Sequence, residues 1–175
     1  MNRAALSETI WRLLDRDLTA MQQEIALYPN DDALWQLPDG IANSGGNLAL
    51  HVAGNLRHFF GAILGSSGYV RDREKEFATR GLSRAAVATE LAVAQREVAV
   101  TLAHLDPAQL AAPYPIRVLD VQLDTATFLL HLCTHLTYHL GQIDYHRRLT
   151  TGTNTTARTV SIPLLIDSPP DAPST

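Results

Sequence analysis

Cysteine and lysine are nearly missing from this sequence, and long apolar runs are missing altogether. Cys133 is the single cysteine among 175 residues, so an internal disulfide is excluded and nothing points to an oxidising compartment. Its position between Leu132 and Thr134 predicts a small buried residue in preference to a reactive thiol. No segment reaches the roughly 18 uninterrupted apolar residues of a membrane span, and the N-terminal residues show no apolar core of a secretory signal. We therefore expect a cytoplasmic protein with no membrane partner.

Basic residues are outnumbered by acidic ones. The chain has 14 Lys and Arg against 18 Asp and Glu, which gives a formal net charge of -4. Nucleic-acid binding needs clustered basic side chains at the phosphate groups, so nucleic acid is not an expected partner. The run from Arg71 to Glu76 alternates in sign, which predicts a solvated segment and not a basic patch.

Patterns typical of strands are almost absent, whereas apolar residues at helical spacing recur in four segments. The predicted helices cover about residues 7–28, 44–64, 83–105 and 125–150, with N-caps at Ser7, at Asn43 or Ser44, at Thr79 or Ser83, and at Asp124 or Thr125. Four amphipathic helices without strands predict an all-α four-helix bundle. The connections of about 15 residues are longer than those between adjacent antiparallel helices, which allows long crossover connections.

The predicted domain organisation is simple. Residues 1–150 form a single bundle domain and residues 151–175 an extended C-terminal tail, in which residues 160–166 are apolar enough to pack on the bundle. Inside the second helix, Gly54 and Gly61 each cost about 1 kcal/mol relative to alanine. We infer that another helix or a ligand approaches the backbone closely there.

Four of the seven histidines fall within residues 131–146. His131, His135 and His139 are spaced four apart and climb one face of the predicted fourth helix, with neighbouring Cβ atoms roughly 5 to 6 Å apart. Apolar neighbours flank this face, which indicates partial burial. A divalent metal ion would satisfy several buried imidazoles at once, and the alternative is a set of core histidines hydrogen-bonded to carbonyl groups or water.

Spacing alone leaves the ligands of such a metal site open. Two ligands can come from His135 and His139 or equally well from His131 and His135, and a third is needed from another helix. His51, in an apolar part of the second helix, is the best candidate, and His58 is the alternative. Neutral imidazole suits zinc, nickel, copper and iron, so the ligand type does not select the metal.

The stretch HLTYHLGQ, residues 135–142, resembles the HxxxHxGQ signature of the DinB/YfiT-like superfamily. These proteins carry a lone histidine on the second helix, which His51 in NLALHVAGNLRHF matches. The resemblance spans roughly residues 7–150. It implies a four-helix bundle of unusual helix order, usually a homodimer, with a divalent ion, often nickel or zinc, held by His51, His135 and His139.

The resemblance also implies a choice of functions. Some relatives are S-transferases whose metal holds a low-molecular-weight thiol as a thiolate that attacks an electrophile, and others are described as metal-dependent hydrolases that use a metal hydroxide. No glutamate follows His135, so the HExxH arrangement is excluded, and Asp144 is rotated about 140° from His139 on an ideal helix. The transferase needs fewer groups and is the preferred prediction. The third hypothesis is a metal-binding or stress-related protein without catalytic activity.

Several other polar residues are secondary candidates. Asn55, Tyr138 and Gln142 can support a metal ligand or line the pocket, and each can equally be a packing residue. His131 is assigned to the pocket or, preferably, to the core as a hydrogen-bonded residue. His104 and His146 are predicted at the surface. No general base or substrate is identified.

Overall fold

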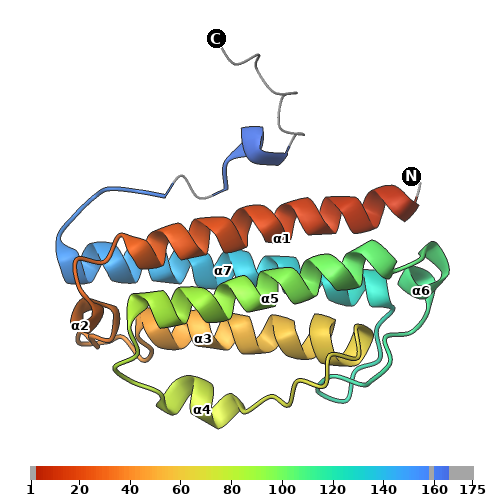
Figure 1. Cartoon of the computed structure of the whole chain (residues 1–175), viewed down its shortest axis with the longest axis horizontal. Coiled ribbons are helices and arrows are strands. Elements are labelled where there is room, and N and C mark those ends of the chain that lie inside the picture. The colour runs from red at the N-terminus through yellow and green to blue at the C-terminus, as the bar shows by residue number, and fades with distance from the viewer. Residues whose placement is uncertain (1–2, 158–159, 166–175) are drawn as a thin grey trace.

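Four long helical elements, each with one apolar face, form most of the protein (Figure 1). The computed structural model describes residues 3–157 and 160–165. The long elements are α1 (Arg3–Ala26), α3 (Gly45–Leu56) with its π-helical continuation η1 (Arg57–Leu64), α5 (Arg84–His104) and α7 (Thr125–Thr151). The short ones are α2 (Asp31–Leu34), α4 (Arg73–Ala78), α6 (Pro107–Ala111) and the 3-10 turn η2 (Ile162–Leu165). The predicted all-α bundle is confirmed.

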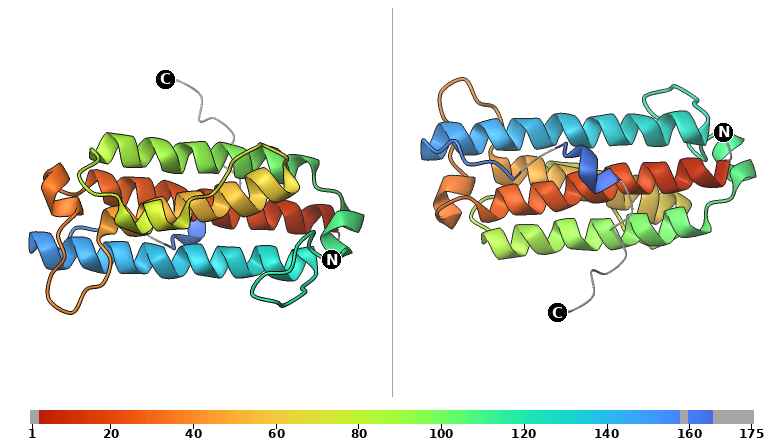
Figure 2. Two further views of the ribbon diagram at one scale, coloured as in Figure 1. Left: turned by 90° about the horizontal axis from the view of Figure 1, so that it is seen from below. Right: turned by 90° about the horizontal axis from the view of Figure 1, so that it is seen from above.

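The order of the helices requires a long crossover. The first and last helices, α1 and α7, run in one direction, and α3 and α5 run in the other (Figures 1 and 2). Helix α1 packs against α5 and α7, and α3 packs against the same two helices. Because α3 and α5 are parallel, the chain returns along the length of α3 before α5 begins. This crossover, residues 65–83, carries α4 and lays it against α3.

Side-chain caps begin three of the long helices where the sequence indicates. The side chains of Ser44, Ser83 and Asp124 each accept a hydrogen bond from the backbone N–H three residues later. The predicted cap at Ser7 is wrong: α1 already includes Arg3, and Ser7 lies inside the helix, where its hydroxyl donates to the Leu105 carbonyl at 3.5 Å. Serine can satisfy its hydroxyl within a helix, so its presence alone does not fix a helix start.

The core is apolar, as the four helical patterns predict, and Cys133 belongs to it. Burial raises the pKa of the Cys133 thiol to about 12, so the sulfur stays protonated and unreactive near neutral pH. The proline-rich connection before α7 forms only isolated β-bridges, Pro113 with Asp124 and Val118 with Val121. In the part of the chain that the structure describes, no helix is both long and apolar enough to cross a membrane.

The prediction that His146 lies at the surface is wrong, because the ring is buried beneath the loop that follows α2. Its Nε2 lies 2.9 Å from the Gln36 carbonyl oxygen and its Nδ1 lies 2.6 Å from the Tyr28 hydroxyl. A carbonyl can only accept, so Nε2–H donates to Gln36 and Nδ1 accepts from Tyr28. The other predicted surface histidine, His104, is exposed.

The first part of the predicted tail is fixed to the bundle by a buried ion cluster. Arg147 and Glu24 are fully buried and form an ion pair at 2.5 Å. Arg147 also donates to the Thr155 carbonyl, and the other Glu24 oxygen accepts from the Ala157 N–H at 2.9 Å. Farther on, η2 lies against α1, where Arg12 donates to the Leu165 carbonyl at 3.1 Å. Residues 166–175 lie outside the described residues.

Replacing Arg147 with methionine tests the energetic importance of this cluster. The Arg147→Met variant leaves the Glu24 carboxylate buried without its partner, so we expect the free energy of unfolding to fall by about 3–5 kcal/mol. The matched control is Arg148→Met, which removes a partly exposed partner of Asp144 and should cost less than about 1 kcal/mol. Urea unfolding followed by circular dichroism measures both, and equal losses would contradict the assignment.

Candidate metal centre

Local sequence fixes His51 in the second turn of α3. Ser44 caps this helix, accepting from the Asn47 N–H at 3.2 Å, and the first turn packs closely because Gly45 and Gly46 have no side chain. A Cβ at Gly45 would collide with Tyr28, and one at Gly46 with the Trp35 ring. His51 follows one turn later and is buried, so its imidazole must find partners inside the protein.

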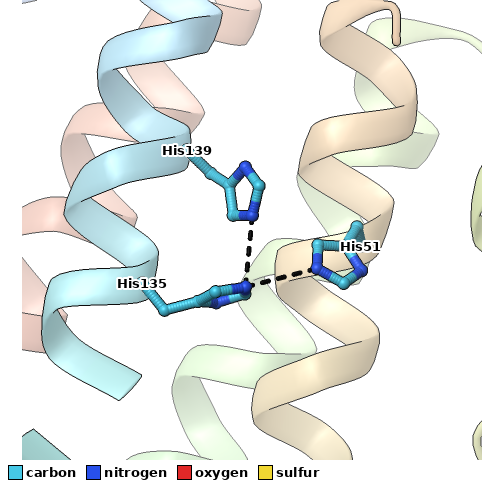
Figure 3. A group of neighbouring side chains, drawn as sticks. All are labelled: His51, His135 and His139. Carbon is cyan, nitrogen blue, oxygen red and sulfur yellow. Dashed lines mark hydrogen bonds between the residues drawn. The ribbon is translucent and has the colours of Figure 1, made fainter. Parts of the chain in front are cut away.

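His135 and His139 lie one turn apart in the middle of α7 and are half-buried. Figure 3 shows their rings pointing across to His51 on the facing helix. The Nε2 atom of His135 lies 3.4 Å from Nε2 of His51 and 3.2 Å from Nε2 of His139. One ring nitrogen from each histidine lies within 4.8 Å of the other two, and the three could hold a metal ion. We call these residues the histidine triad.

The outward nitrogens of two triad histidines have hydrogen-bond partners. His51 Nδ1 lies 2.9 Å from a carboxylate oxygen of Glu76 on α4, and His139 Nδ1 lies 2.7 Å from the Gln142 side-chain oxygen. Gln142 in turn donates to the Tyr138 hydroxyl at 3.1 Å. An Nδ1–H that donates to oxygen leaves the Nε2 lone pair free, which is the arrangement that metal-binding histidines use. Within the described residues, both hydrogen-bond contacts of His135 are made by Nε2 and none by Nδ1.

Glu76 is a buried carboxylate that Arg71 and His51 hold in place. Arg71 binds both of its oxygens, at 2.7 and 2.9 Å, while His51 binds one of them. Burial alone would raise the pKa of Glu76, but the hydrogen bonds from His51 and Arg71 outweigh it and hold that pKa below its ordinary value. Glu76 is therefore ionised beside the triad.

The two triad histidines of α7, His135 and His139, are neutral near pH 7. Burial is the largest cause, and together with the neighbouring His139, His51 and His131 and the Arg71 cation it lowers the pKa of His135 to about 4. Burial also lowers the pKa of His139, against an opposing effect of Gln142. A neutral imidazole has a lone pair available for a metal ion, whereas a protonated one has none.

The secondary candidates differ in whether they contact the histidine triad. Gln142 contacts the triad, and Tyr138, although mostly exposed, reaches it through Gln142. Asn55 is buried on the same face of α3 as His51, and its side-chain oxygen makes no hydrogen bond within the described residues. The preferred assignment of His131 to the core is wrong: the residue is exposed, with its ring stacked on Phe128 at a centroid distance of 6.1 Å.

Glu76 and Arg71 are the site residues that sequence reasoning missed. The alternating run that contains them is solvated over most of its length, but Glu76 faces inward and is buried. One signal was present in the sequence: Gly54 predicts a close approach to α3, and a Cβ there would collide with the Glu76 carboxylate. The approaching group is therefore a side chain of the crossover. At Gly61 it is the Glu97 carboxylate of α5.

A cavity of about 430 Å³ adjoins the site without including the triad. Its walls come from α3, the crossover and α5, and Gly54 and Glu76 are among its lining residues. None of the three histidines lines it, so Glu76 contacts His51 and also borders this cavity.

Comparisons with known proteins identify a family. The sequence profile of the DinB superfamily matches residues 13–143, which is well over half of the chain and includes all three triad histidines. No match was found among curated proteins or among solved structures.

Proposed function

Since the chain belongs to the DinB superfamily, we propose that it binds a divalent metal ion, nickel or zinc, through His51, His135 and His139. The observation that carries the proposal is the convergence of three half-buried or buried imidazoles on one point. Three nitrogen ligands suit either metal and leave a coordination position for a further molecule. Buried imidazoles without a partner are costly, so an ion also offsets the penalty of placing three together.

For the reaction, we propose transfer of a low-molecular-weight thiol to an electrophile. When bound, a divalent ion would favour deprotonation of a thiol placed beside it. The S–H bond then breaks, the proton passes to solvent, the sulfur forms a bond to the electrophilic carbon, and the leaving group departs with the electron pair of its own bond. His51, His135 and His139 would hold the ion. The side-chain oxygen of Asn55, one turn after His51, makes no hydrogen bond within the described residues and offers an acceptor to the bound molecule.

The carboxylates near the triad support a transferase over a hydrolase. Activation of water usually uses a free carboxylate or histidine as general base. Both oxygens of Glu76 are engaged by Arg71 and His51, and Asp144 is engaged by Arg147 and Arg148. A metal-dependent hydrolase is the runner-up, and a non-catalytic metal-binding or stress-related protein is the third candidate.

We further propose that the protein forms a homodimer. Relatives suggested by the family resemblance are usually dimeric, and the outward face of α7 carries exposed apolar and aromatic side chains, at Leu130, Tyr138, Tyr145 and Leu149. Gly141 lies between them, and a side chain there would meet open space within the chain. Glycine in a helix interior is unfavourable, so its presence here needs a reason. Close packing of a second copy against the backbone at Gly141 would supply one.

Metal binding is tested by elemental analysis of protein purified without chelator or histidine tag and supplied with Ni²⁺ and Zn²⁺. We expect about one ion per chain. His51→Ala and His139→Ala should each abolish stoichiometric binding because each removes one of three ligands. His131→Ala should keep it, since that ring is exposed on the neighbouring turn. Wild type without bound metal would refute the proposal, and a larger loss in His131→Ala than in His139→Ala would refute the ligand assignment.

Transferase activity is tested by mixing metal-loaded protein with a panel of small thiols and monochlorobimane. Conjugation should exceed the uncatalysed rate for at least one thiol and return to that rate in His139→Ala. Conjugation no faster than the uncatalysed reaction with every thiol would refute the transferase. Metal- and His139-dependent hydrolysis of ester substrates in the same preparation would then support the runner-up.

The homodimer is tested by light scattering coupled to size-exclusion chromatography. Wild type should have about twice the chain mass of 19.1 kDa. The double variant Tyr145→Lys/Leu149→Lys should elute as a monomer with an unchanged helical spectrum, because charge on the α7 face opposes its burial. A wild-type mass of one chain would refute the dimer, and a dimeric double variant would refute this face.

A further inference from the structure

We infer that Glu76 and Arg71 are positioning residues of the metal centre: the crossover between α3 and α5 delivers a carboxylate–guanidinium pair that sets the tautomer and orientation of His51. The inference rests on the proposed metal binding at the triad and goes beyond it, because neither residue is a ligand. The two lie on the crossover, whereas the triad lies on α3 and α7.

The contacts around His51 Nδ1 admit two tautomers. Glu76 Oε2 lies 2.9 Å from this nitrogen and can only accept, whereas Arg71 Nη2 lies 3.2 Å from it and can only donate. If Nδ1 carries the hydrogen, it donates to Glu76 and the Nε2 lone pair faces the other two histidines. If Nε2 carries the hydrogen, Nδ1 accepts from Arg71 and a hydrogen points into the triad. Only the first tautomer can bind a metal through Nε2.

The geometry favours the first tautomer. The contact with Glu76 is the shorter one and involves an ionised acceptor, which makes it the stronger hydrogen bond. Arg71 loses nothing in that state, because its Nη2 and Nε already donate to the two Glu76 oxygens at 2.9 and 2.7 Å. In the second tautomer, Glu76 loses a donor, and the Nε2–H of His51 gains only the longer contact with His135 Nε2 at 3.4 Å.

Neighbouring residues hold the Glu76–Arg71 pair in place. Arg71 fixes the plane of the carboxylate by binding both oxygens, and Gly54 leaves the space that the carboxylate occupies against α3. Glu76 is buried while its neighbours Glu74 and Lys75 on α4 are exposed. Carboxylates that hold a ligand histidine raise its basicity, and their loss typically weakens metal binding by about 10–100-fold.

The test uses three variants and two measurements. Glu76→Gln removes the charged acceptor, and Glu76→Gln/Arg71→Met also removes the cation that would otherwise be left unpaired. Glu74→Gln is the matched control on the exposed side of α4. Long-range ¹H–¹⁵N spectra of the metal-free proteins give the His51 tautomer, with signals assigned through His51→Gln. Competition with a chelator gives the dissociation constant for Zn²⁺, and thermal unfolding checks the fold.

Wild type and Glu74→Gln should show hydrogen on His51 Nδ1 and the same Zn²⁺ affinity. Glu76→Gln should shift the tautomer toward Nε2–H and weaken Zn²⁺ binding by about 10–100-fold. The double variant should still bind Zn²⁺ weakly even if its unfolding temperature is higher than that of Glu76→Gln. That result would separate an effect on positioning from an effect on folding. Hydrogen on Nε2 in wild type, or a double variant with wild-type affinity, would overturn the inference. If wild type binds no metal, metal binding fails while the tautomer result still decides the role of Glu76.

Discussion

The packing of α3 against α7 is the contact on which the site depends. These helices run in opposite directions, so a histidine in the second turn of α3 faces the middle of α7 and meets two imidazoles one turn apart (Figure 3). The interface buries polar rings where water is scarce, and each ring must then find a partner in the protein. Gln142 and Glu76 supply two of these partners on the outer side of the rings. The inner nitrogens are left facing one another, and that is the arrangement a cation stabilises.

Sequence reasoning succeeded where a property depends on nearby residues. Caps at Ser44, Ser83 and Asp124 and the four apolar patterns locate the long helices, because caps and amphipathicity are local. The spacing of His135 and His139 places both rings on one face for the same reason. The apolar setting of His51 favours it over His58, and the family resemblance fixes that choice. The choice of His139 over His131 came from the resemblance alone, since helical spacing allows either. The structure brings together the set that the resemblance implies.

The wrong assignments of His131 and His146 concern which face of a helix another element covers. Residues four apart drift by about 40° around a helix, so the row from His131 to His139 turns by about 80°. Because of this rotation, His131 is exposed whereas His139 is half-buried. No local sequence pattern shows how far along α7 the facing helix α3 covers it. His146 is buried because a distant carbonyl, Gln36, and the Tyr28 hydroxyl reach it. Both partners are more than a hundred residues away in sequence.

Glu76 shows how the helix order determines the chemistry available at the site. Because α3 and α5 are parallel, the chain must run back along α3, and only this return brings α4 behind His51. A buried carboxylate is costly unless it is paired, and Arg71 pairs it. The carboxylate also needs space against α3, which Gly54 provides at a cost of about 1 kcal/mol in helix propensity. An apolar residue at position 76 with alanine at position 54 would remove both costs and preserve the packing. The chain instead keeps a buried acid that contacts His51, a cation that pairs this acid, and a helix glycine that makes room for it. This combination argues that the His51 ring must be held in one orientation.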